Sequence, residues 1–105
     1  MIIIETSVFT RQIDRLLGLD GYRDLQNYLV DDPKRGAVIP GTGGLRKVRW
    51  QTGGRGKRGG IRVIYYWIVD QSTILMLLAY PKSEQDDLTT AQKRALKQVV
   101  EKELK

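Results

Sequence analysis

The stretch GTGGLRKVRWQTGGRGKRGGIRVIYY, residues 41–66, decides the fold. Its LRKVRW segment at 45–50 divides its side chains between two faces as a β-strand does, and Val48 and Trp50 form the better core pair. The run IRVIYYWIV at 61–69 is long, apolar and rich in β-formers, which is typical of a central strand buried on much of both faces. The two segments with the glycine-rich loop between them therefore predict a β-hairpin.

The segments on either side of this hairpin predict further strands and helices. IIIE at 2–5 is a short strand, and TILMLLAY at 73–80 is the strand after the hairpin, reached through a turn at 70–72. Helical spacing before the hairpin predicts two helices, whose apolar faces are formed by Phe9, Ile13, Leu16 and Leu17 and by Tyr22, Leu25, Tyr28 and Leu29.

The ends of these helices have local signals. Asp20 is expected to cap the second helix and Pro33 to end it, and the glycine- and proline-bearing residues 34–44 are expected to form a loop. Thr89 and Gln92 fit a capping box that opens a last helix, whose predicted buried stripe is Ala95, Leu96, Val99 and Val100.

The predicted order is β-α-α-β-β-β-α within a single domain, residues 1–105. It indicates an α+β fold in which two N-terminal helices and one C-terminal helix pack on a small, mostly antiparallel sheet.

The composition limits the chemistry available to this protein. The chain has 105 residues without cysteine or histidine, so disulfides, thiolate nucleophiles, histidine acid–base catalysis and the usual zinc ligands are excluded. No apolar stretch approaches the roughly 20 residues of a membrane span, and the first residues lack the features of a signal peptide. We therefore expect a cytoplasmic protein that uses Lys, Arg, Tyr, Ser, Thr or carboxylate side chains.

The net charge of +6 is concentrated in one part of the chain. The segment between Pro33 and Val69 carries nine basic residues and no acidic one, whereas the rest carries nine basic and twelve acidic residues. A local positive field of this kind favours an acidic partner. The nine residues are Lys34, Arg35, Arg46, Lys47, Arg49, Arg55, Lys57, Arg58 and Arg62.

The loop of the hairpin contains GRGKRG at 54–59, which matches the glycine pattern of dinucleotide-binding proteins. That pattern requires a helix after the loop, and here a strand follows, so we reject this interpretation and the related phosphate-binding P-loop. The cations Arg55, Lys57 and Arg58 instead favour contact with a phosphate backbone, although a merely mobile turn is the simpler alternative.

Lys47, Arg49 and Arg62 form a second group, because pairing of the two strands brings them towards one end of the sheet. Such a group of cations stabilises the charge of a reacting phosphate, unless each cation is paired with a carboxylate from the helices. Tyr80 ends its strand beside Pro81 and can stack a base or take part in proton transfer. The acidic SEQDD at 83–87 is adequately explained by solubility or by the dipole of the last helix.

These segments together resemble the RelE/ParE superfamily of toxins from bacterial toxin–antitoxin pairs. The resemblance rests on the element order, on the glycine-, lysine- and arginine-rich loop, and on GTGGLRKVRW, GIRVIYYWI and LLAYPKSEQDDLT. It is greatest to the HigB-like RelE branch and covers the chain from the second helix to the last one. It implies a RelE-like fold and a toxin domain.

The resemblance also implies an activity. Such toxins are ribosome-dependent mRNA endoribonucleases that cut the message in the A site and inhibit translation, without a metal or other cofactor. The 2′-hydroxyl attacks the adjacent phosphate and leaves a free 5′-hydroxyl. By position, Lys47 and Arg49 match a basic pair of the family, Arg62 its phosphate-clamping arginine, and Lys82 the basic residues after the last strand; Arg46, Arg55, Lys57 and Arg58 would contact ribosomal RNA.

The chain departs from the RelE prototype before the last helix, where an arginine and then a tyrosine are replaced by Ser83 and Leu88. Tyr80 is a candidate substitute from a neighbouring place. The general base therefore stays open between Tyr80, Lys47 and Lys82.

The implied partners are a cognate antitoxin of the helix-turn-helix type, the ribosome and mRNA, with no membrane involved. Two other functions stay open, namely a non-catalytic RNA-binding module that uses the same basic face, and a gyrase-directed toxin as in the ParE branch. The basic RKVR and GRGKRGG segments favour the RNA-cutting branch.

Overall fold

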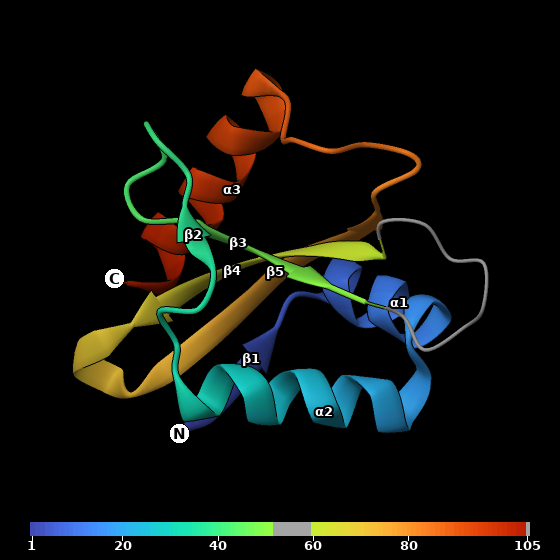
Figure 1. Cartoon of the computed structure of the whole chain (residues 1–105). Coiled ribbons are helices and arrows are strands. Elements are labelled where there is room, and N and C mark those ends of the chain that lie inside the picture. Colours follow the sequence, from blue (N-terminus) through green and yellow to red (C-terminus); the bar gives the residue numbers. More distant parts are fainter. Residues whose placement is uncertain (52–59, 105) are drawn as a thin grey trace.

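The computed structural model describes residues 1–51 and 60–104. In this part of the chain five strands form one sheet and three α-helices pack on it (Figure 1). The predicted α+β class and the predicted order of elements are confirmed. The strands are β1 (Ile2–Glu5), β2 (Ala37–Val38), β3 (Arg46–Trp50), β4 (Ile61–Ile68) and β5 (Thr73–Pro81), and the helices are α1 (Ser7–Leu16), α2 (Gly18–Asp31) and α3 (Thr90–Glu103).

The strands lie in the order β1-β5-β4-β3-β2. The pairs β2–β3, β3–β4 and β4–β5 are antiparallel, whereas β1 pairs parallel to β5 at the edge of the sheet. The predicted hairpin of β3 and β4 is therefore confirmed. The prediction of an unbroken loop at 34–44 is wrong, because Ala37 and Val38 pair with Lys47 and Arg46 and add the short strand β2.

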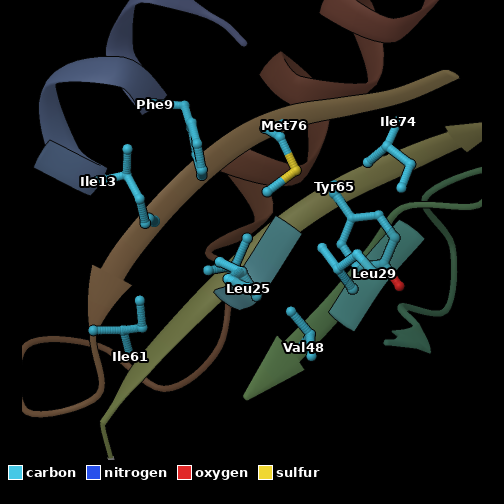
Figure 2. Packing of buried hydrophobic residues seen from close by; sticks show 11 residues of the cluster. Phe9, Ile13, Leu25, Leu29, Val48, Ile61, Tyr65, Ile74 and Met76 are labelled. Carbon is cyan, nitrogen blue, oxygen red and sulfur yellow. The ribbon is translucent and has the colours of Figure 1, made fainter. Parts of the chain in front are cut away.

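The core has two apolar clusters, one on each face of the sheet. α1 and α2 cover the first face, where Phe9 and Ile13 meet Leu25, Leu29 and strand residues such as Tyr65 (Figure 2). α3 covers part of the opposite face. The second cluster consists of Leu45, Ile64, Leu75, Leu77, Tyr80, Leu88 and Val100.

The central strand β4 contributes to both clusters, as its nearly continuous apolar sequence predicts. Ile61, Val63 and Tyr65 face α1 and α2, whereas Ile64 faces α3. Because side chains alternate along a strand, Arg62 shares the face of Ile64.

A β-bulge interrupts the pairing of β4 with β5. Ile64 pairs with Leu78, but the next residue, Tyr65, pairs with Met76, so Leu77 is an extra residue on β5. The bulge changes which face the following side chains occupy. Ala79 consequently joins the cluster under α1 and α2, and Tyr80 joins the cluster on the α3 side.

The ends of the helices confirm one cap prediction and correct another. Thr89 and Gln92 form the predicted capping box of α3. α2 begins earlier than expected, because Gly18 adopts a φ of 71° and turns the chain directly from α1 into α2. Asp20 therefore lies in the first turn and is not the N-cap.

The predicted buried stripe of α3 is only partly correct. Val100 is buried, Leu96 and Val99 are half-buried, and Ala95 is exposed. The reason is that α3 does not close against α1. An apolar groove lies between them, lined by Thr6, Val8, Leu77, Leu78, Gln92, Ala95, Leu96 and Val99.

The buried hydroxyl of Tyr65 fixes the turn that precedes β2. It donates a hydrogen bond to the Pro33 carbonyl at 2.7 Å and accepts one from the Gly36 amide at 2.8 Å. A Cβ atom on Gly36 would lie 2.7 Å from the Tyr65 ring, so only glycine fits there.

Across the described residues, none of the helices is long and apolar enough to cross a bilayer.

Candidate phosphate-binding site

Three polar side chains form a row across the three central strands, near one end of the sheet. Arg49 on β3 is the direct partner of Arg62 on β4, and Arg62 is the direct partner of Tyr80 on β5. Direct partners lie on the same face of a sheet, about 4.5–5.5 Å apart at Cβ. Lys47, two positions before Arg49, shares this face. The structure thus brings together four of the predicted site residues, on the α3 side of the sheet.

These side chains differ in their exposure to solvent. Arg62 is 4% exposed and Tyr80 is 5% exposed, so both are embedded in the sheet. The Lys47 side chain is 17% exposed, and Arg49 is exposed. A buried guanidinium requires hydrogen-bond partners. One of them is the carbonyl of Ile61, which accepts from Nη1 of Arg62 at 3.3 Å.

Two carboxylates from the segment between β5 and α3 reach this cluster. Oδ1 of Asp87 lies 2.6 Å from Nζ of Lys47, and Oδ1 of Asp86 lies 3.3 Å from Nε of Arg62. The main-chain carbonyl of Asp86 accepts hydrogen bonds from Tyr80 at 3.3 Å and from Lys47 at 3.4 Å. From sequence alone, these acidic residues were explained by solubility or by the helix dipole. The structure shows that Asp86 and Asp87 instead contact Arg62 and Lys47.

The segment carrying these carboxylates is fixed at both ends. At its start, the Lys82 amide donates to the Gly60 carbonyl at 3.1 Å. Towards its end, Leu88 is buried in the second cluster, and the Gln85 side chain bonds both the Asp87 carbonyl and Gln92 of α3. In Figure 1 this segment, drawn in orange, runs on the α3 side of the sheet.

The surroundings of the site shift two pKa values. The hydrogen bond from Lys47 and its positive charge lower the pKa of the Asp87 carboxyl. Burial raises the pKa of the Tyr80 hydroxyl, and the nearby charges of Asp87 and Asp86 raise it further against the opposing effect of Arg62. At neutral pH Asp87 is therefore ionised, and Tyr80 keeps its proton and can donate a hydrogen bond.

The remaining predicted site residues lie elsewhere or outside the described residues. Arg46 lies on the opposite face of β3 and donates to the carbonyls of Gly36 at 2.7 Å and Lys34 at 3.3 Å, so it is not part of the cluster. Lys82 follows β5 directly, and it is exposed. The predicted RNA contacts Arg55, Lys57 and Arg58 belong to residues 52–59, outside the described part of the chain.

The two positions where the chain departs from the RelE prototype have different surroundings. Ser83 is exposed in the turn after β5, whereas Leu88 is 7% exposed and packs in the second cluster. The apolar Leu88 is therefore a core residue that holds the acidic segment against the sheet.

The row of Lys47, Arg49, Arg62 and Tyr80 offers hydrogen-bond donors and positive charge on one face. This is the chemistry that binds a phosphate group and stabilises added negative charge on it.

Across residues 1–51 and 60–104, no three carboxylate, histidine or cysteine side chains gather closely enough to hold a metal ion.

The fold and the site are those of a small α+β protein with a basic sheet face. No family model matches the sequence. The structure is similar to a solved structure of a mutant of the E. coli toxin RelE in the free state, with a TM-score of 0.56 and 17% sequence identity. The similarity covers 81% of this chain and 86% of RelE. The chain therefore has a RelE-like fold.

Proposed function

We propose that this protein is the toxin of a type II toxin–antitoxin pair and an mRNA endoribonuclease of the HigB-like RelE branch. It acts on mRNA in the ribosomal A site, in the cytoplasm, and it needs no metal. The RelE-like fold supports the class of protein, and the sequence motifs between Gly41 and Leu88 support the branch. The observation that carries the activity is the row of Arg49, Arg62 and Tyr80 on one sheet face.

In this mechanism the scissile phosphate lies over the row. Arg62 and Arg49 hold its non-bridging oxygens and stabilise the charge that develops on them. A base takes the proton of the 2′-hydroxyl, the O2′–P bond forms as the P–O5′ bond breaks, and the departing 5′-oxygen takes up a proton, which gives a cyclic phosphate and a free 5′-hydroxyl. Arg62 acts from a rigid position, because its side chain is embedded in the central strand.

The protonation state of Tyr80 limits the role that its hydroxyl can take in the reaction. Tyr80 keeps its proton because its pKa is raised, so we assign it to hydrogen-bond or proton donation and not to the base. Lys47 faces the same space, adds positive charge beside Arg49 and stays one candidate for the base. The exposed Lys82 stays a second candidate for proton transfer at the end of β5.

A cognate antitoxin of the helix-turn-helix type is the proposed protein partner. Exposed apolar side chains support such a partner, since single-chain proteins rarely leave extended apolar surface uncovered. Ile2 is 61% exposed, Ile4 38% and Val8 43%, and Val8 also lines the groove between α1 and α3.

The proposal is tested by primer extension on a defined mRNA that is translated in a purified system. We expect cuts at codon positions when ribosomes are present and none when they are omitted. Cuts without ribosomes would contradict the A-site mechanism. Retention of uncut RNA would favour the non-catalytic binding module, and intact mRNA with damaged DNA in cells would favour a gyrase-directed toxin.

A further inference from the structure

The anion-binding side chains of this site already hold anions from the same chain. Lys47 contacts the Asp87 carboxylate at 2.6 Å, and Arg62 contacts the Asp86 carboxylate at 3.3 Å. A carboxylate and a phosphate use the same donors with similar geometry, because both accept charge-assisted hydrogen bonds from Lys and Arg. The two aspartates thus stand where two oxygen-bearing anionic groups of a ligand would stand.

We propose that Asp86 and Asp87 are internal occupants of two phosphate subsites, and that RNA binds by displacing them from Arg62 and Lys47. This inference rests on the proposed function, since it takes RNA as the ligand. The segment 82–89 is then a competing strap that the substrate moves aside.

The carboxylates are suited to being displaced. The side chain of Asp87 is 76% exposed and that of Asp86 is 53% exposed, so water can replace their contacts at little cost. Ion pairs at exposed positions contribute little to stability. The cations they contact are much less exposed, at 17% for the Lys47 side chain and 5% for the Arg62 side chain.

The strap is held at both ends, and its middle lies outside the regular elements of secondary structure. Leu88 is buried, and the capping box of Thr89 and Gln92 fixes the start of α3. Between Pro81 and Leu88 the backbone forms neither helix nor strand. A small rotation about these ends would lift Asp86 and Asp87 without unfolding α3.

A structural role for the pair makes a different prediction. If the aspartates only fix the segment and are part of the bound state as well, removal of a carboxylate would loosen the site and weaken RNA binding. If the strap competes with RNA, removal of a carboxylate removes a competitor for its cation and tightens binding. The sign of the change in affinity therefore separates the two roles.

The test measures binding of a fluorescent RNA oligonucleotide with 2′-O-methyl groups, which cannot be cut, at fixed low salt. The variants are Asp86→Asn and Asp87→Asn, each of which keeps the main-chain carbonyl contacts of the segment. Glu84→Gln is the matched control, because it removes one charge from the same segment and, among the described residues, Glu84 makes no ion pair. We expect each aspartate variant to bind about two- to fivefold more tightly than Glu84→Gln does.

Hydrogen exchange supplies a second readout that mere charge removal would not move. In the wild-type protein, we expect the amides of residues 84–88 to exchange faster when the oligonucleotide is bound. Slower exchange there, or weaker binding by the aspartate variants, would overturn the inference. So would equal affinity of the aspartate variants and Glu84→Gln, with the proposed function left standing. Failure of the wild type and of every variant to bind the free oligonucleotide would overturn the inference alone, since the proposed function is tested separately by cleavage on ribosomes.

Discussion

Arg62 and Tyr80 are direct partners across β4 and β5 because the bulge at Leu77 shifts the pairing by one residue; without it, Arg62 would pair with Ala79. With unbroken alternation along β5, Tyr80 would face α1 and α2 together with Ile74 and Met76. The bulge turns Tyr80 to the α3 side, next to the buried guanidinium. Bulges that redirect a side chain in this way are over-represented beside active sites.

The hydroxyl of Tyr80 is predicted to act in cleavage as a donor. Tyr80→Phe keeps the ring in the core and removes only the group that bonds the Asp86 carbonyl at 3.3 Å. We expect ribosome-dependent cleavage in single turnover to slow about a hundredfold, with little change in the melting temperature. Tyr66→Phe, which lies on the same sheet face at the far end of β4, is the control. Cleavage by Tyr80→Phe at the wild-type rate would exclude this role.

Arg49 is predicted to contribute to function far more than to stability. Its side chain is exposed, and among the described residues it makes no ion pair. Arg49→Ala should therefore slow cleavage about a hundredfold while the free energy of unfolding changes by less than about 0.5 kcal/mol. Arg23→Ala on α2 removes the same charge from the opposite side of the sheet and should cleave normally. Equal cleavage by the two variants would place the phosphate elsewhere.

The pairing of Asp87 with Lys47 predicts a response to acid. The pKa of the Asp87 carboxyl in the folded protein lies below its unfolded value of about 3.9, so the pair stabilises the fold above that pH. This contribution is lost as the pH falls through the folded-state pKa. A titration of the Asp87 side-chain carboxyl by ¹³C NMR should show the depressed pKa, and Lys47→Met should return it towards the ordinary value. An unchanged titration in Lys47→Met would show that the pair does not form in solution.

The buried hydroxyl of Tyr65 is predicted to stabilise the fold without a part in cleavage. Tyr65→Phe leaves the Gly36 amide without its partner in a buried position. We expect the free energy of unfolding to fall by about 1–3 kcal/mol in urea titrations. Tyr66→Phe is the control, because it removes the hydroxyl of a half-buried tyrosine that makes no hydrogen bond within the described residues. Equal losses in the two variants would contradict the assignment of the stability to the Tyr65 contacts.

Local sequence signals predicted most of this fold. The spacing of apolar residues predicted β3, β4, β5 and the helices. The capping box of Thr89 and Gln92 could be predicted because its two residues are close in sequence. The strand β2 was missed because it has only two residues, both exposed, and pairs solely with β3. The cap of α2 was missed because the backbone of Gly18, and not a side chain at Asp20, sets where that helix starts.

The candidate site was predicted in part, and the reasons are again physical. Alternation along β3 predicts that Lys47 and Arg49 share one face and that Arg46 lies on the other face. The hydrogen bonds of Arg46 to the loop before β2 could not be predicted in this way. The ion pair between Lys47 and Asp87 joins residues 40 positions apart, so it depends on the path of the segment after β5. The bulge at Leu77 likewise depends on pairing with β4, and no residue of β5 signals it by type.

The most direct test of the account is the rate at which Arg62→Ala cuts mRNA on translating ribosomes, compared with Arg23→Ala. Both variants must first show the wild-type circular dichroism spectrum, and Arg62→Lys serves as a second variant that keeps the charge without the planar donor group. We predict that Arg23→Ala cuts normally, that Arg62→Ala loses cleavage by at least about a thousandfold, and that Arg62→Lys recovers little of it. Cleavage by folded Arg62→Ala at the wild-type rate would contradict the central claim that this face of the sheet is the site of the reaction.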